Sequence, residues 1–313
     1  MFNEKVNKLV ELVEKGILTE KEMLEAVRLI SKDVKEHVFS QFNKGLSYEL
    51  VYRNGTLGYE VSQGSCDDCY FVTIDNTYRS LPVIGIAEDG FAYCSDLREI
   101  EFPNTLLYIG DRAFSGCFNL REASLTNTEL LKIGDEAFHG CESLLRLEWP
   151  KTLTYIGECA YFGCESLGAI IVLGNVKTLS SSLFRRCYNI SSIWLDYSKI
   201  ETIEDDVFFE CHNVEKIHFP RTLKEIKSCA FAGCKNLSKI VYEGNYDDWL
   251  KIKKSEDWNQ DTPSCTLKCN DYETTIDEGN AYVYTEQWLK DRLKCNPPQI
   301  TKEQIIKNYL DNN

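Results

Sequence analysis

The sequence lacks several features that define common functional classes. It has no apolar run long enough to span a membrane, and residues 1–5 contain no basic region followed by a long apolar stretch, the pattern that directs export. Positive charge is scarce: 35 Lys and Arg oppose 49 Asp and Glu, a formal net charge of −14. Because nucleic acids and anionic membranes are bound by basic patches, we expect neither as a partner. The simplest meaning of the charge is a solvated acidic surface.

Catalytic motifs are also missing. The chain has only four His, none in an HExxH metal motif, and it contains neither a Walker phosphate loop nor a GxSxG nucleophile elbow. His212 directly follows Cys211, but adjacent side chains in a strand or turn point apart, so we do not expect a catalytic pair. The prediction is a protein that is not an enzyme and holds no cofactor.

Cysteine, by contrast, is abundant, with 14 in the chain. Seven recur at intervals of 23 or 24 residues: Cys94, Cys117, Cys141, Cys164, Cys187, Cys211 and Cys234. A fixed interval of this length indicates one supersecondary unit repeated along the chain. Repeat solenoids of this kind usually act by presenting a surface.

Other positions keep the same phase relative to each repeated Cys. An aliphatic residue stands eight before it, an aromatic three before, a small turn-former two after, and apolar residues three and six after. The second repeat shows the pattern with Ile109, Phe114, Asn119, Leu120 and Ala123. We expect a short turn or helical segment, a corner, and a brief strand, with the strands stacked about 4.8 Å apart in one parallel sheet. The predicted fold is an α/β repeat solenoid with this sheet on one face.

The repeated Cys is interpreted as a core residue, since it is small, apolar and close to an aromatic. Stacked strands would place neighbouring repeated Cys roughly 5 Å apart, close to disulfide range. However, the uniform spacing favours packing, and 14 Cys without a visible export signal favour free thiols in a reducing cytoplasm.

Two cysteine pairs break the phase, Cys66 with Cys69 and Cys265 with Cys269. Such pairs could hold zinc or act in redox chemistry. They lie at opposite ends of the stack, roughly 30–35 Å apart from the strand spacing, so they cannot share a metal, and each pair alone lacks two ligands. We therefore predict no metal site, and a zinc or redox role is kept as a minor alternative.

The repeat resembles that of BspA-type leucine-rich repeat proteins. Residues 109–117 with Leu120 carry the likeness, residues 133–153 and 156–167 match similarly, and 226–240 match less fully. It covers roughly residues 48–271 with both end caps, and it implies a bacterial, non-catalytic solenoid with repeats of about 23 residues. The repeats depart from the family at two positions that affect local turn geometry: the one after the first aliphatic (Ala87, Ser180, Glu204, Lys227) and the one before Cys (Arg186, Glu210).

The two ends read differently from the middle. Residues 3–15 and about 20–42 have the apolar spacing of two amphipathic helices, and Thr19 with Glu22 forms a capping box for the second. The stretch from Leu9 to Leu29 is similar to the short helical hairpin called SHOCT, which implies oligomerisation or docking; a helical cap over the first repeat is the alternative. Residues 285–294 and 301–310 are expected to be two short helices of a C-terminal tail.

The predicted organisation therefore has five parts. They are a helical hairpin (1–45), an N-terminal cap (46–82), seven repeats (83–244), a C-terminal cap (245–271) and a helical tail (272–313).

The candidate site is the outward side of the predicted strands. Residues five and seven after each Cys should face outward, on either side of the buried residue at six. The first three repeats place an acidic strip there: Glu99, Glu101, Glu122 and Glu148. Later repeats place Ile171, Trp194, His218 and Val241, with Leu173 just beyond. Exposed Trp beside aliphatic residues is typical of binding hot spots.

We therefore predict a protein-binding patch centred on Trp194, with the acidic strip steering a basic segment of the partner. Two alternatives remain open: the terminal helices cover the patch, or the phase is shifted by one residue and Trp194 is buried.

The predicted function is non-catalytic protein binding, as a scaffold, adhesin-like or host-interaction module. The alternative is a structural protein that forms homo-oligomers through residues 1–45. The missing export signal predicts a cytoplasmic location, whereas the family resemblance implies secretion or surface display.

Overall fold

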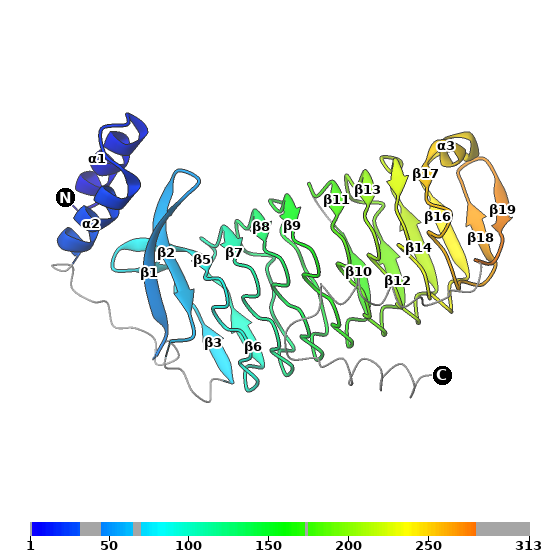
Figure 1. The fold of residues 1–313 in the computed structure, drawn as a ribbon, viewed down its shortest axis with the longest axis horizontal. Coiled ribbons are helices and arrows are strands. Elements are labelled where there is room, and N and C mark those ends of the chain that lie inside the picture. Colours follow the sequence, from blue (N-terminus) through cyan, green and yellow to red (C-terminus); the bar gives the residue numbers. More distant parts are fainter. Residues whose placement is uncertain (1, 32–44, 65–69, 173–174, 280–313) are drawn as a thin grey trace, which may run out of the picture. The chain divides into compact units, whose positions relative to one another are not determined.

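The computed structural model describes residues 2–31, 45–64, 70–172 and 175–279 (Figure 1). The chain begins with helices α1 (Phe2–Glu14) and α2 (Glu20–Ser31). The predicted capping box is confirmed: the Glu22 N–H donates to Thr19 Oγ1 over 3.2 Å, and the Thr19 N–H donates to the Glu22 carboxylate over 2.8 Å. The predicted extension of the second helix to residue 42 lies outside the described residues.

The N-terminal cap is a β-hairpin joined to the first repeat. Strands β1 (Ser47–Arg53) and β2 (Thr56–Ser62) pair antiparallel. The turn residues Asn54 and Gly55 have φ of 51° and 78°, as a two-residue hairpin turn requires. Strand β2 then pairs in parallel with β5 (Leu81–Ile86), while β4 (Thr77–Tyr78) pairs antiparallel with β5.

Two ladders of short parallel strands form the solenoid, and Figure 1 shows them along opposite edges of the stack. The rear ladder carries the aliphatic residue that precedes each repeated Cys. It begins with β5 and continues through β7 (Tyr108–Ile109), β8 (Lys132–Ile133), β9 (Tyr155–Ile156), β11 (Thr178–Leu179), β13 (Thr202–Ile203), β15 (Glu225–Ile226) and β17 (Lys253–Lys254). Its pairing is interrupted between β9 and β11.

The front ladder carries the strands that follow each repeated Cys. It comprises β3 (Phe71–Thr73), β6 (Glu99–Glu101), β10 (Ala169–Ile171), β12 (Ser192–Trp194), β14 (Lys216–Phe219), β16 (Lys239–Tyr242) and β18 (Cys265–Lys268), and ends in antiparallel β19 (Glu273–Ile276). Strand β6 pairs with β3 and contacts repeat two through a single bridge, Glu99 to Glu122. Residues 146–148 of repeat three form no strand.

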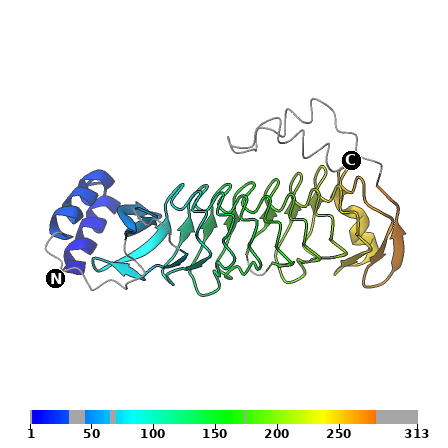
Figure 2. The same ribbon diagram turned by 90° about the horizontal axis from the view of Figure 1, so that it is seen from below.

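The prediction of one strand per repeat in one sheet is therefore wrong, because most repeats supply two strands. The fold is a β-solenoid, and the segment between the two strands is a series of turns in every repeat (Figure 2). The reason is local geometry. Two positions per repeat have positive φ, which interrupts a right-handed helix. Five before Cys they are Asp89, Arg112, Glu136, Cys159, Ser182, Asp206 and Cys229; one before Cys they are Tyr93, Gly116, Gly140, Gly163, Arg186, Glu210 and Gly233.

Stacked aromatic rings run through the core. Each ring three before a repeated Cys packs on the equivalent ring of the next repeat, with centroids 5.1–5.6 Å apart from Phe91 to Phe231. Tyr161 is the only Tyr in this row, and its hydroxyl accepts a hydrogen bond from Trp149 Nε1 over 3.0 Å. The one polar group placed in the row is thereby satisfied within the core.

The repeated cysteines form a second row as free thiols, as their packing interpretation predicts. In six of them Sγ donates to the carbonyl oxygen of the aromatic residue in the preceding repeat, over 3.0–3.5 Å. These six are fully buried, whereas Cys94 at the start of the row is partly exposed. A small apolar side chain that can donate to a carbonyl explains why Cys recurs at this position.

The C-terminal cap is built on α3 (Tyr246–Lys251) and strands β17 to β19. Trp249 and Trp258 are buried there, and the Trp258 ring packs edge-on against Phe231, the last ring of the aromatic row. Cys265 and Cys269 are both buried. The predicted tail helices at 285–294 and 301–310, like the pair Cys66 and Cys69, lie outside the described residues.

Candidate functional site

The register of the front ladder fixes which residues face outward. Ile170, Ile193, Ile217 and Ile240 stand directly opposite one another and are fully buried. Since successive strand residues point to opposite faces, their neighbours at positions five and seven face solvent. Ile171 is 49% exposed and Trp194 is partly exposed. The predicted phase is confirmed, and the alternative in which Trp194 is buried is wrong. We call this outward surface the strand face.

One column of the strand face brings the predicted apolar residues together. Ile171 stands opposite Trp194, Trp194 opposite His218, and His218 opposite Val241. The indole of Trp194 stacks on the His218 ring with centroids 3.8 Å apart and an angle of 18°. Lys216 Nζ lies 5.2 Å from the centre of the indole, a cation–π contact. The indole is therefore held in one orientation with part of its surface exposed. The remaining residue predicted for the patch, Leu173, lies outside the described residues.

His218 is fixed in turn by Asp196, whose carboxylate lies 3.8 Å from His218 Nδ1. Both side chains are nearly buried, at 12% and 10% exposure. Burial lowers the pKa of His218, and the charge of Lys216 lowers it further. The ring is therefore neutral at pH 7, and it supports the indole as a flat neutral surface. Sequence reasoning missed Asp196, because it follows the strand by two residues and belongs to no repeated position.

The acidic strip occupies the lower-numbered repeats. Glu99, Glu101, Glu122 and Glu148 are all exposed. Thr73 Oγ1 donates to the Glu101 carboxylate, and Ser124 Oγ donates to that of Glu148, each over 3.1 Å. The strip and Trp194 share one face, but Glu148 belongs to repeat three and Trp194 to repeat five.

Lysines lie beside the apolar column at its His218 and Val241 end. Lys216 and Lys239 stand opposite each other in the adjacent column, and Lys268 stands opposite Val241. The outward positions of Lys216 and Lys239 follow from the sequence, because each lies five residues after a repeated Cys. Lys268 was missed because it lies on β18, beyond the seven recognised repeats.

The cysteine and histidine candidates for chemistry are separated from one another. Cys211 is buried and its Sγ donates to the Phe184 carbonyl over 3.1 Å, whereas His212 stacks on Tyr188 with centroids 5.3 Å apart. Burial raises the pKa of Cys211 well above its ordinary value, which disfavours the nucleophilic thiolate. Within the described residues, no three His, Cys, Asp or Glu side chains form a group that could bind a metal.

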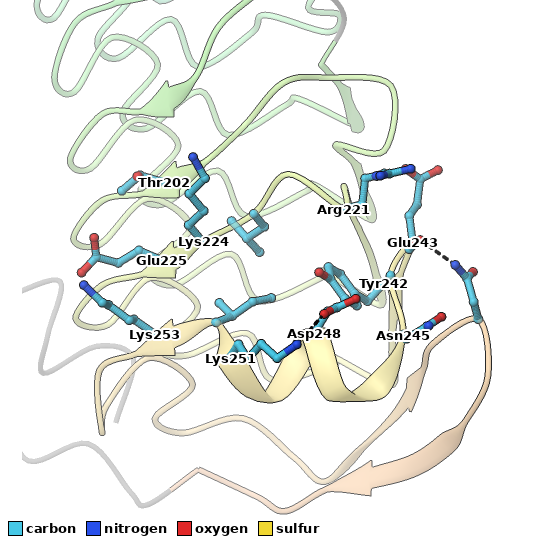
Figure 3. Close-up of a pocket in the computed structure, with 14 residues that line it drawn as sticks. Thr202, Arg221, Lys224, Glu225, Tyr242, Glu243, Asn245, Asp248, Lys251 and Lys253 are labelled. Atoms are coloured by element: carbon cyan, nitrogen blue, oxygen red, sulfur yellow. Dashed lines mark hydrogen bonds and ion pairs between the residues drawn. The ribbon is translucent and has the colours of Figure 1, made fainter.

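A pocket of about 770 Å³ lies beside α3 (Figure 3). Lys224, Glu225 and Lys253 come from one side, and Tyr242 and Asp248 from the other. Its charges are largely matched within the chain, because Lys224 pairs with Glu201 and Lys251 lies 2.9 Å from Asp248. This pocket could not be predicted from the sequence, since its walls come from loops and strands of successive repeats and from the cap.

A solenoid with recurring aliphatic, aromatic and Cys positions and a ladder of short parallel strands is a leucine-rich repeat protein. The family model described as the BspA type leucine rich repeat region matches residues 64–191 and 131–251, which together cover more than half of the chain. The chain belongs to this family, as the sequence resemblance predicted.

Solved structures of bacterial leucine-rich repeat proteins are similar to this chain. A leucine-rich repeat protein of T. pallidum is 26% identical, with a TM-score of 0.56 over 62% of this chain and 88% of that one. A leucine-rich repeat protein from Bacteroides ovatus is 23% identical, with a TM-score of 0.45 over 70% of this chain and 66% of that one. No curated protein matches the sequence significantly. In the described part of the chain, no helix has the length and apolar character needed to cross a membrane.

Proposed function

We propose that the chain is a non-catalytic protein-binding solenoid, a scaffold, adhesin-like or host-interaction module, whose ligand docks on the strand face. The observation that carries this proposal is the column formed by Ile171, Trp194 and His218. A partly exposed indole stacked at 3.8 Å on a neutral ring and flanked by a 49% exposed isoleucine offers apolar contact at low cost in conformational entropy.

Membership of a repeat family supports binding over catalysis, because a rigid ladder presents a fixed row of side chains to a partner. The acidic strip supports a basic segment in that partner, since exposed carboxylates on one face attract positive charge and raise association rates. Both locations considered from the sequence, cytoplasm and cell surface, stay predictions.

Capture from cell lysate and from host extract tests the proposal. We would compare the native chain with a Trp194→Asp/Ile171→Asp variant. The matched control is Leu131→Asp/Tyr155→Asp, which alters two apolar residues at or beside rear strands with similar exposure, 40% and 47%. A partner that is lost by the first variant and kept by the control supports the proposal. A partner kept by both variants, each shown to be folded by circular dichroism, contradicts it.

Self-assembly through residues 1–45 is the second candidate. Ile17 and Leu29 of this hairpin region are 64% and 60% exposed. These apolar side chains are therefore available for contact with a second copy. If the hairpin drives assembly, deleting residues 1–45 lowers the mass in solution. An unchanged mass after the deletion removes this candidate.

A further inference from the structure

Charge on the strand face is segregated along the stack. Outward positions five and seven form eight successive rungs: Glu99/Glu101, Glu122/Ser124, Arg146/Glu148, Ala169/Ile171, Ser192/Trp194, Lys216/His218, Lys239/Val241 and Thr266/Lys268. All four glutamates lie on the first three rungs, and all three lysines lie on the last three. The apolar pair Ile171 and Trp194 lies on the two middle rungs.

Among the residues that the structure describes, none of these seven charged side chains forms an ion pair. Glu273 of β19 stands opposite Lys268 without forming one. Elsewhere in the solenoid, oppositely charged side chains of neighbouring repeats form ion pairs: Arg186 with Glu210 over 2.8 Å, and Lys227 with Glu204 over 2.5 Å. The strand face thus differs from the rest of the stack in keeping both signs available and apart.

We infer that the strand face binds a second copy of this chain, with the two stacks running in opposite directions. The inference rests on the proposed function, which makes this face a protein-binding surface, and it names the occupant. A two-fold axis parallel to the strands reverses the order of the rungs and keeps each column opposite itself. Rung one then faces rung eight, two faces seven, three faces six, and four faces five.

This pairing places glutamates against lysines of the second copy and apolar residues against apolar residues. Glu101 faces Lys268 of the second copy, Glu122 faces Lys239, and Ile171 faces Trp194. Glu148 faces the rung of Lys216 and His218, where Arg146 opposite Lys216 is the one like-charged contact. The lysine-bearing half of the second copy is itself the basic segment that the acidic strip fits.

The other two-fold arrangement does not work. An axis along the stack places each rung against the same rung of the second copy with its two columns exchanged. Glu99 then faces Glu101 directly, the acidic half lies against the acidic half, and the lysine-bearing half lies against the lysine-bearing half. Like charges brought together at an interface cost binding energy. Charge therefore selects the antiparallel arrangement.

The size of the face sets the strength of the dimer. Eight rungs at about 4.8 Å and strands of three or four residues at about 3.3 Å give roughly 38 Å by 10–13 Å, or about 400–500 Å² per copy, against about 800 Å² per partner in a standard interface. We expect a dimer that dissociates on dilution and weakens with added salt.

Two charge-reversal variants test the inference. Glu101→Lys/Glu122→Lys/Glu148→Lys leaves Glu99 as the single negative charge on the eight rungs, and Lys216→Glu/Lys239→Glu/Lys268→Glu leaves Arg146 as the single positive one. The control Glu129→Lys/Lys151→Glu reverses two exposed charges away from the strand face. Mass would be measured by sedimentation equilibrium over a concentration series at low salt, after circular dichroism shows that each variant is folded.

The native chain and the control should shift from monomer to twice the monomer mass as concentration rises. Each charge-reversed variant alone should stay monomeric. An equimolar mixture of the two should form a heterodimer, because the substituted positions of one variant then face oppositely charged substituted positions of the other.

A native chain that is monomeric throughout the series, or a mixture that forms no heterodimer, overturns the inference. It also fails if dimerisation survives both charge reversals but is lost on deleting residues 1–45. These failures leave the proposed function separately testable: a different protein that binds the native chain and not Trp194→Asp/Ile171→Asp would support strand-face binding without self-association.

Discussion

Replacing His139 by phenylalanine should make the solenoid less sensitive to acid. The side chain of His139 is 4% exposed and stacks on Phe162 with centroids 4.7 Å apart. Its Nε2 is buried and finds no hydrogen-bond partner among the described residues. Burial of this ring lowers the pKa of His139 from 6.5 to about 4.

The direction in which folding stability changes with pH depends on whether the folded or the unfolded chain binds the proton more readily. The unfolded chain protonates His139 near pH 6.5, whereas the folded chain resists protonation down to about pH 4. The stability that His139 supports is therefore fully present above about pH 6.5 and is lost as the pH falls toward 4. A gap of roughly 2.5 pH units at about 1.4 kcal/mol per unit corresponds to roughly 3 kcal/mol near pH 4.

Urea unfolding followed by circular dichroism at several pH values between 7 and 4 measures this contribution. Phenylalanine keeps the flat ring against Phe162 and cannot be protonated, so His139→Phe should differ little from the native chain at pH 7 and gain on it steadily below pH 6.5. His212→Phe is the matched control, because that ring is only half-buried and its gain should be smaller. A difference between native and His139→Phe that stays constant from pH 7 to pH 4 would refute the reasoning.

Three further predictions concern the repeat itself. Gly140→Ala should lower the free energy of unfolding by about 1 kcal/mol from its positive φ alone, because the new Cβ meets no atom closer than 3.9 Å. Gly134→Ala should lower it by about 3 kcal/mol, because the new Cβ would lie 2.6 Å from a backbone nitrogen. Equal urea midpoints for the two variants would contradict this. Tyr161→Phe should cost about 1–3 kcal/mol in urea unfolding because Trp149 Nε1 loses its buried acceptor, and Trp149→Phe in the same chain should recover part of that loss; no recovery would argue against the hydrogen bond. Cys94→Ser should remove one fast-reacting thiol in a titration of the folded chain with a thiol reagent, since Cys94 is the partly exposed member of its row; replacing any of the six buried members should leave the fast count unchanged, and the reverse result would refute the assignment.

Most of the front ladder could be read from the sequence. The residue six after each Cys is aliphatic or Ala in every repeat, and one buried position per strand is enough to fix which neighbours face outward. Ile171 and Trp194 were identified in this way, and the structure places them opposite each other. The capping box of Thr19 and Glu22 was equally readable, because it depends on residues three apart.

The rear ladder could not be read, although its aliphatic residue was recognised. Its strands are two residues long in most repeats, and a single apolar residue per repeat fits a turn, a helix or a strand equally well. The residues with positive φ five before Cys include Asp89, Arg112 and Cys159, which share no chemical property. The backbone conformation at that position is imposed by stacking of the neighbouring repeats, so it cannot be predicted from the residue type.

The sequence by itself determined the repeat, its phase, the family and the outward residues of the strand face, because each depends on spacing along one chain. The tertiary structure alone decided which of those residues become neighbours. The stack of Trp194 on His218 and the nearness of Lys216 arise from pairing between strands about 23 residues apart. A contact between repeats depends on parallel pairing in register and on the closeness of the rungs, and these follow from how whole repeats pack.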